Sequence, residues 1–152
     1  ISETLHLPWL LHVCGNRQPR QRYASLCQSA DVGATLLDWF GLGGPGPTDG
    51  QSILSALAGK LCSGRQTAVS LGEAGERAIR SPGWLLRRAA PAAHSPALAE
   101  LYAKPDDRWE YNDVASRCPQ VVEWLSAELA RFEACASSGE SLPTMPRNRE
   151  LC

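Results

Sequence analysis

Residues 22–57 constrain the fold most, because they contain two segments bounded by helix start and stop signals. In the first segment, Asp31 is placed to cap a helix, since its carboxylate can accept hydrogen bonds from the N–H groups of the first turn. Gly41 follows the last apolar residue, where a left-handed closing residue is favoured. The apolar residues of this segment share one face at helical spacing: Val32, Leu36 and Trp39 or Phe40.

The second segment repeats this pattern after a loop rich in glycine and proline. An Asp49-Gly50 turn precedes Ser52, a candidate cap, and Gly59 follows as a stop signal. Its expected apolar face consists of Ile53, Leu54 and Leu57. We therefore expect a pair of short helices joined by a loop rich in glycine and proline.

The sequence on either side of this pair is of a different kind. Residues 5–13 are mostly apolar and predict a buried strand, with Pro8 near its start because proline cannot donate a hydrogen bond. From residue 67 onward, short extended segments follow at 67–71, 76–80 and 84–87. The last two are separated by Ser81-Pro82-Gly83 and are therefore expected to form a hairpin.

A regular helix is predicted over residues 119–135. Pro119 suits its first turn, and apolar residues recur at helical spacing. Its apolar face contains Val121, Trp124 or Leu125, Leu129 and Phe132. We expect this helix to pack across the small sheet, and residues 136–152 to form a loose polar tail.

Composition excludes several classes of protein. The net charge is −1, which gives no basic surface for nucleic acid or for an anionic membrane. No apolar run in the sequence is long enough to span a bilayer. The cysteines are too scattered for a zinc site, so buried thiols are the preferred interpretation, with one or two disulfides as an alternative. They are Cys14, Cys27, Cys62, Cys118, Cys135 and Cys152.

Three segments, in the same order along the chain, resemble the C-terminal part of the sulfatases. The first is residues 31–41 (DVGATLLDWFG) with 49–54 (DGQSIL). The second is residues 78–86 (AIRSPGWLL), which is similar to a hairpin of that family. The third is residues 100–115 (ELYAKPDDRWEYNDVA), which is similar to the strand and turn of the family's C-terminal subdomain.

The resemblance implies an α/β fold: the end of a sulfatase-like central sheet with flanking helices, then a small antiparallel sheet packed on a C-terminal helix. Residues 1–62 would end the α/β catalytic domain, residues 63–136 would form the subdomain, and residues 137–152 would be the tail. The chain begins with Ile1, and we expect it to be the back end of a longer protein whose N-terminal catalytic portion is its partner.

The sequence lacks the family's nucleophile motif, Cys/Ser-x-Pro-x-Arg. We therefore predict no catalytic residue and no metal ligand in this chain, although the resemblance implies calcium in the complete protein. Only Arg80, His12 and His94 are candidates for substrate contacts, on their chemistry alone. The predicted function is a C-terminal sulfatase fragment, inactive by itself. A related phosphate or phosphonate ester hydrolase and a non-enzymatic binding domain remain alternatives.

An acidic cluster in the third segment has two interpretations. It consists of Asp106, Asp107, Glu110 and Asp113. A calcium loop is one of them, but the cluster lacks the regular alternation and the glycine of such loops. The preferred prediction is a strand end and turn whose side chains bind local backbone N–H groups.

Overall fold

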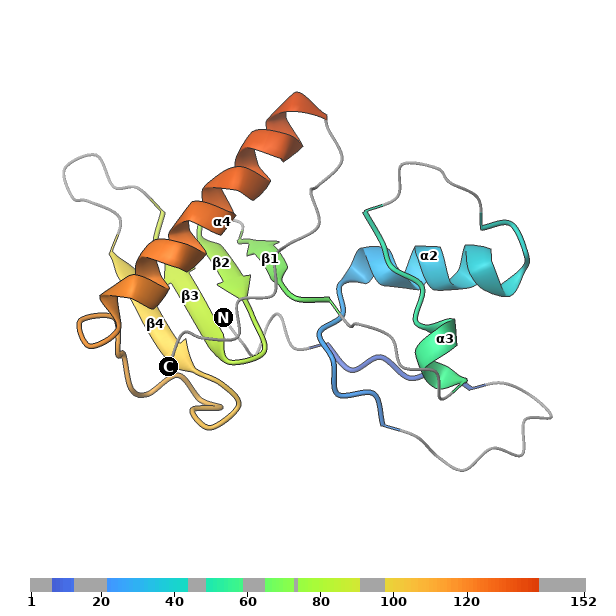
Figure 1. Cartoon of the computed structure of the whole chain (residues 1–152), viewed down its shortest axis with the longest axis horizontal. Coiled ribbons are helices and arrows are strands. Elements are labelled where there is room, and N and C mark those ends of the chain that lie inside the picture. The colour runs from blue at the N-terminus through green and yellow to red at the C-terminus, as the bar shows by residue number, and fades with distance from the viewer. Residues whose placement is uncertain are drawn as a thin grey trace.

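The computed structural model describes residues 7–12, 22–43, 49–58, 65–72, 74–90 and 98–139. These residues form a pair of helices followed by a sheet and a long helix, as Figure 1 shows. The helix pair is α2 (Ser29–Trp39) and α3 (Leu54–Leu57). The rest is β1 (Ala68–Leu71), β2 (Arg77–Arg80), β3 (Trp84–Arg88), β4 (Ala99–Ala103) and α4 (Pro119–Ser138).

The sheet is an antiparallel meander with strand order β1-β2-β3-β4. The predicted hairpin is confirmed: Arg80 pairs with Leu85 across the Pro-Gly turn, and Ile79 pairs with Leu86. The turn is closed by a hydrogen bond of 2.8 Å from the N–H of Ser81 to the carbonyl of Trp84. Alternating side chains give this sheet two faces, and only one of them contacts α4.

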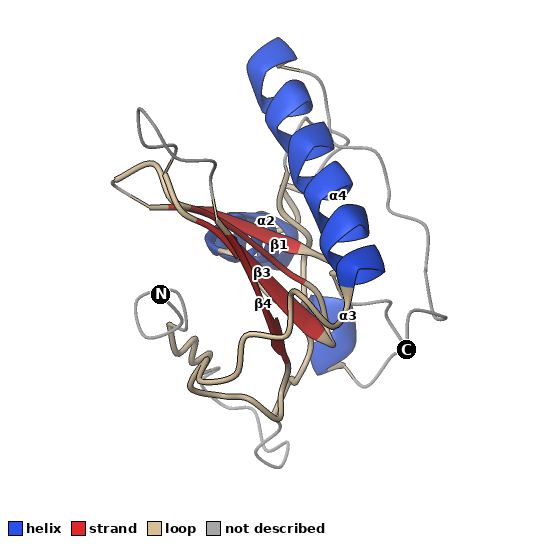
Figure 2. Ribbon diagram, turned by 90° about the vertical axis from the view of Figure 1, so that its left-hand side faces the viewer, coloured by secondary structure: helices blue, strands red, loops and turns tan. Residues whose placement is uncertain are grey.

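The main core lies between the sheet and α4, which runs along one face of the strands in Figure 2. Its fully buried members are Ile79, Leu86 and Leu101 from the strands and Val121, Leu125 and Leu129 from the helix. The predicted helix is thus confirmed, with its apolar face on the sheet. It begins at Pro119 and ends at Gly139, which takes a left-handed φ of 71°.

Both edges of the sheet carry side-chain contacts. On the outer side of β4, the carboxylate of Asp113 accepts the N–H of Leu101 at 2.9 Å, and the N–H of Val114 donates to the Leu101 carbonyl at 2.9 Å. On the outer side of β1, the Gln28 amide donates to the Val69 carbonyl at 2.7 Å. These bonds occupy backbone groups that an edge strand otherwise leaves unpaired.

The start of α2 differs from the prediction. Asp31 is not the capping residue; it is the third residue of the helix, and Gln28 is the cap. The carboxylate of Asp31 reaches back to the N–H of Gln28 at 2.8 Å, as the acidic member of a capping box does. Gly41 closes the helix with a φ of 68°, as predicted.

The polar face of α2 is the buried one. Asp31 and Thr35 are 1% and 2% exposed, and they hold the segment before α3. The N–H of Gln51 donates to Asp31 at 2.8 Å, and that of Ile53 donates to the Thr35 hydroxyl at 3.2 Å. The packing of this helix on its own loop therefore depends on hydrogen bonds rather than on apolar contact.

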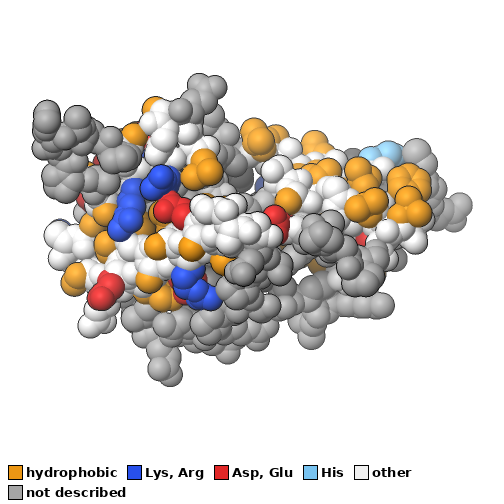
Figure 3. All heavy atoms as spheres, turned by 90° about the horizontal axis from the view of Figure 1, so that it is seen from above, with side chains coloured by type: hydrophobic (Ala, Val, Ile, Leu, Met, Phe, Trp, Pro, Cys, Tyr) orange, Lys and Arg blue, Asp and Glu red, His pale blue; other side chains and the backbone are white. Residues whose placement is uncertain are grey.

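The apolar face of α2 is exposed. We call these residues the α2 patch: Val32, Leu36, Leu37, Trp39, Phe40 and Leu42. Their exposed fractions run from 36% for Val32 to 71% for Leu42. Hydrophobic side chains gather on this part of the surface in Figure 3. The sequence predicted this face correctly as a helical stripe, but among the described residues it does not form part of a core.

Two further expectations need correction. Residues 7–12 lie in no strand, and Leu10 is 91% exposed. A strand forms only when a neighbour accepts its backbone hydrogen bonds, and no described residue pairs with this segment. The C-terminal helix continues to Ser138, three residues beyond the predicted end. Among the described helices, none combines the length and the hydropathy needed to cross a bilayer.

Candidate functional site

The three predicted contact residues do not converge. Arg80 ends β2 at the hairpin turn, and His12 is exposed in the irregular segment near the N-terminus. His94 lies outside the described residues. In the described part of the chain, no hydrogen bond or ion pair joins His12 to Arg80, so these two do not form one site.

Arg80 is partly buried and held by the hairpin turn. Its Nη1 donates to the carbonyl of Trp84 at 3.1 Å and also to that of Ser81. Burial lowers the pKa of Arg80, while the charge of Glu110 opposes this shift. Among the described residues, no side chain or carbonyl accepts from its Nε or Nη2. The guanidinium therefore retains donors of the planar kind that suit a sulfate or phosphate group.

The turn between β4 and α4 lies at the same end of the sheet. The N–H of Lys104 donates to the Gly83 carbonyl at 2.8 Å, which ties this turn to the β2–β3 hairpin. The Lys104 ammonium is nearly buried and pairs with the Glu110 carboxylate at 3.3 Å. It also donates to the carbonyls of Asp107 and Arg108, at 2.7 and 3.2 Å. Because one ammonium binds three oxygens of the turn, the backbone there is held in a single shape.

Two members of the acidic cluster, Asp107 and Asp113, bind backbone N–H groups, as the preferred prediction required. Asp107 accepts the N–H groups of Tyr111 at 3.0 Å and Asn112 at 2.9 Å. These bonds, led by the one from Asn112, lower the pKa of Asp107. Asp113 likewise accepts from the N–H of Ala115 at 2.9 Å, in addition to that of Leu101.

These carboxylates do not fit the calcium that the family resemblance implies. Both oxygens of Asp107 and Oδ1 of Asp113 accept backbone N–H groups, an arrangement that shapes the turn rather than one that surrounds a cation. Within the described residues, no three His, Cys, Asp or Glu side chains are grouped so that they could hold a metal.

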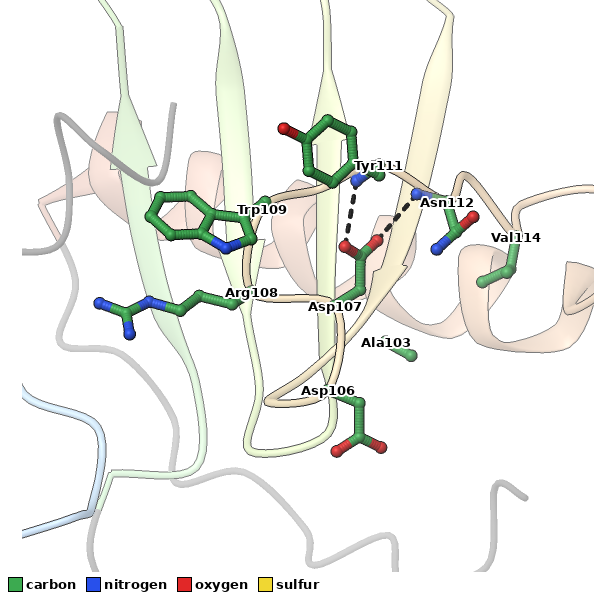
Figure 4. A pocket seen from close by; sticks show the side chains of 8 residues that line it. All are labelled: Ala103, Asp106, Asp107, Arg108, Trp109, Tyr111, Asn112 and Val114. Carbon is green, nitrogen blue, oxygen red and sulfur yellow. Dashed lines mark hydrogen bonds between the residues drawn. The ribbon is translucent and has the colours of Figure 1, made fainter.

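A shallow open hollow of about 410 Å³ lies on this turn. Figure 4 shows its lining, with the rings of Trp109 and Tyr111 on the near side of the strands and α4 behind them. The sequence interpretation did not single out these two aromatic residues. A signal was present, because large aromatic side chains in a polar turn have no core to enter. The lining residues are Ala103, Asp106, Asp107, Arg108, Trp109, Tyr111, Asn112 and Val114.

The other buried ionic group has a structural role. Asp31 forms an ion pair with Arg65, whose Nε donates to it at 3.2 Å. Burial raises the pKa of Asp31, but the bonds from Arg65 and from two backbone N–H groups outweigh it, so the pKa lies below its ordinary value. Arg65 also donates to the Asp49 carbonyl at 2.9 Å. This cluster joins α2 to the segments on either side of α3, and its oxygens are occupied.

Comparison with known proteins finds similarity only at the level of structure. No protein-family model matches the sequence. No curated protein matches it at a significant level. Similar folds do occur among solved structures, and three of them are sulfatases.

The first is a sulfatase of Bacteroides thetaiotaomicron, from work on glycosaminoglycan metabolism; the match has 24% identity and a TM-score of 0.52, and covers 71% of this chain and 24% of that one. The second is BT4656, solved with its substrate D-glucosamine-2-N,6-O-disulfate, at 16% identity and a TM-score of 0.56, covering 76% and 25%. The third is yidJ of Bacteroides fragilis, assigned as a sulfatase, at 15% identity and a TM-score of 0.50, covering 74% and 25%.

The chain thus spans about a quarter of the length of the sulfatases it matches. The matched region is their C-terminal part, whose antiparallel sheet and helix correspond to β1–β4 and α4. This agrees with the resemblance drawn from the three sequence segments. The described part of the chain has the fold of the C-terminal part of the sulfatases.

Proposed function

We propose that this chain is the C-terminal part of a sulfatase-type sulfuric ester hydrolase. It acts together with an N-terminal catalytic portion, which supplies the nucleophile and the metal ligands. The observation that carries the proposal is the coverage of the structural matches: 71 to 76% of this chain, but only 24 to 25% of each sulfatase. The absence of Cys/Ser-x-Pro-x-Arg from the sequence is a second support.

The α2 patch is the proposed contact with the catalytic portion. Its six apolar residues are exposed together, whereas Asp31 and Thr35 on the opposite face of α2 are buried and bonded. A contiguous apolar surface of this kind is typical of one that another folded unit covers. The α2 patch would then become part of a core shared by the two portions.

An activity assay tests the functional part of this proposal. The chain alone is expected to hydrolyse neither 4-nitrophenyl sulfate nor 4-nitrophenyl phosphate. Together with the product of the coding sequence upstream of Ile1, it is expected to hydrolyse the sulfate ester. Turnover of the sulfate by the chain alone would contradict the proposal. Preferential turnover of the phosphate by the pair would favour a phosphate ester hydrolase instead.

Two matched leucine variants test the contact surface. Leu42 lies in the α2 patch and is 71% exposed; Leu98 lies beside β4 and is 68% exposed. We expect Leu42→Asp to weaken the association with the catalytic portion by at least about tenfold, because a charge is then buried without a partner. Leu98→Asp is the control and is expected to leave association unchanged. Equal effects of the two variants, measured by calorimetry, would exclude the α2 patch as the contact.

A further inference from the structure

The turn between β4 and α4, which carries the hollow, has a backbone that its own side chains hold in place. Lys104 donates to two carbonyls of the turn and to the carboxylate of Glu110. Asp107 accepts two backbone N–H groups on the outer side. Because the backbone is already ordered, a ligand that binds to this turn pays little of the usual cost of ordering a loop.

The turn presents two large aromatic side chains and several hydrogen-bond donors. Trp109 is 61% exposed and Tyr111 is 83% exposed, and Figure 4 shows both rings leaving the same loop. The Arg108 guanidinium lies 5.2 Å from the centre of the Trp109 ring. In the described part of the chain, no acceptor binds the indole N–H of Trp109 or the hydroxyl of Tyr111. The hollow therefore offers aromatic faces together with N–H and O–H donors, including the carboxamide of Asn112.

A proline-containing peptide in the polyproline II conformation has the complementary chemistry. This helix has three residues per turn, so prolines three residues apart lie on the same side and present two flat apolar rings. It has no internal hydrogen bonds, so its backbone carbonyls are free to accept from donors beside the rings. Surfaces lined by exposed aromatic side chains bind Pro-x-x-Pro segments in this way.

The chain itself contains one such segment. Pro143-Thr-Met-Pro146 is the only place in the sequence where two prolines are three residues apart. Arg147 follows directly, and its charge is opposite to that of Asp106, an exposed carboxylate in the lining of the hollow. Residues 140–152 lie outside the described part of the chain, so the motif is a feature of the sequence.

The segment does not reach the hollow of its own molecule. The hollow lies at the start of α4, because its lining residue Val114 accepts the N–H of Cys118, the residue before the helix, at 3.1 Å. The 20 residues of α4 then carry the chain about 30 Å away, at about 1.5 Å per residue. The steps from Ser138 to Pro143 return at most about 18 Å, even when fully extended. The segment that fills the hollow must therefore come from another molecule.

We propose that the hollow binds the Pro143–Pro146 segment of a second copy of this chain. The proline rings pack on Trp109 and Tyr111, and carbonyls of the segment accept hydrogen bonds from the indole N–H and the tyrosine hydroxyl. The contact is head-to-tail, because the hollow of one copy meets the C-terminal segment of another. It uses a surface separate from the α2 patch and does not depend on the proposed hydrolase function.

A peptide titration followed by NMR of the tryptophan indole N–H groups tests the site. The receptor is the full chain with Pro143→Ala and Pro146→Ala, so that its own segment does not compete. The probe is a synthetic peptide of residues 140–149, and the control is the same peptide with alanine in place of both prolines. We expect the probe to shift the Trp109 resonance saturably while that of Trp39 stays in place, and the control to shift neither. Trp109→Ala identifies the resonance and is expected to weaken binding by at least about tenfold.

Mixing two full-length variants tests whether the contact joins separate molecules. Both carry Leu42→Asp, which removes association through the α2 patch, and circular dichroism verifies that each is folded. One has Trp109→Ala and keeps the segment; the other has Pro143→Ala and Pro146→Ala and keeps the hollow. Sedimentation is expected to show each alone as a monomer and the mixture as a complex.

Three results would overturn the proposal. The first is that the probe leaves the Trp109 resonance unshifted. The second is that the proline-free control binds as well as the probe. The third is that the mixture of the two variants stays monomeric, which would mean that the segment does not join two copies.

Discussion

At the scale of single residues, Asp31 is the buried ionised group on which the first half of the chain depends. Its side chain is 2% exposed and that of its partner Arg65 is 10% exposed. The bonds of Asp31 reach Arg65, Gln28 and Gln51, three residues far apart in the sequence. Removing one charge of such a pair leaves the other buried without compensation.

We predict that Asp31→Asn lowers the free energy of unfolding by about 3 kcal/mol. Chemical denaturation followed by circular dichroism measures this. Asp38→Asn is the matched control on the same helix, because Asp38 is exposed and accepts one bond of 2.5 Å from the Ser52 hydroxyl. Its expected cost is below about 1 kcal/mol. If the two variants lost equal stability, the buried ion pair would contribute no more to the free energy of unfolding than the exposed Asp38 hydrogen bond does.

The same residue predicts a dependence on pH. The folded-state pKa of Asp31 lies below its ordinary value of 3.8, so the folded protein favours the carboxylate. Its stabilisation is therefore complete above the unfolded-state pKa and is lost as the pH falls through the folded-state pKa. We expect the stability difference between the wild type and Asp31→Asn to be constant at neutral pH and to shrink below 3.8. A difference that grows on acidification would contradict this.

At the scale of elements, the loop before α3 approaches α2 so closely that only glycine fits. A Cβ on Gly50 would collide with the backbone carbonyl of Ala30 and would lie 3.0 Å from the Cβ of Ala34. Both obstacles belong to α2, whose backbone cannot yield without breaking its own hydrogen bonds.

Gly50→Ala is therefore predicted to destabilise the helix pair by about 1–3 kcal/mol. Gly33→Ala is the control, because Gly33 lies inside α2 and has no heavy atom within 4 Å of an added Cβ. It is expected to stabilise by about 0.5–1 kcal/mol, since alanine favours a helix. Thermal unfolding of the two variants compares them directly. The two changes in the free energy of unfolding are expected to have opposite signs. If Gly50→Ala left the stability unchanged, the loop would be free to move away from α2.

The elements show which features of a sequence can be interpreted without a structure. The hairpin and α4 were predicted because Pro82 and Gly83 mark a turn and the apolar residues of α4 repeat at helical spacing. The exposure of the apolar face of α2 did not follow from spacing, because spacing defines an apolar stripe but does not say what covers it. The strand prediction for residues 7–12 was wrong for a related reason, since strand formation depends on a neighbouring strand that local sequence does not specify.

The candidate site was predictable only in part. The carboxylates of Asp107 and Asp113 were correctly assigned to backbone contacts, because Asp in a turn commonly binds nearby N–H groups. Arg80 was singled out, but the carbonyls that hold it were not foreseen. The aromatic residues of the hollow carried a signal that was not used, but the shape of the turn, which Lys104 holds, does not follow from sequence spacing.

At the scale of the whole molecule, burial is distributed unevenly. The sheet and α4 share a core of six fully buried apolar residues. In α2, by contrast, only Asp31 and Thr35 are buried, and α3 has no buried residue. Regions with few buried apolar contacts open at lower free energy than the core does.

Hydrogen exchange is expected to reflect this difference. Backbone amides of Ile79, Leu86 and Leu101 should exchange slowest, and those within α2 should exchange faster in the isolated chain. Adding the catalytic portion should slow exchange in α2 without altering the sheet, if the α2 patch is covered. Uniform protection of both regions in the isolated chain would contradict the expectation.

The bonds on the outer side of β4 have a consequence for aggregation. Because Asp113 and Val114 already occupy the free N–H and carbonyl of Leu101, the middle of this edge is closed to a strand from a second molecule. Gln28 occupies the Val69 carbonyl on the opposite side. If the isolated chain aggregates, we expect amorphous oligomers that associate through exposed apolar helix surfaces, and not amyloid fibrils.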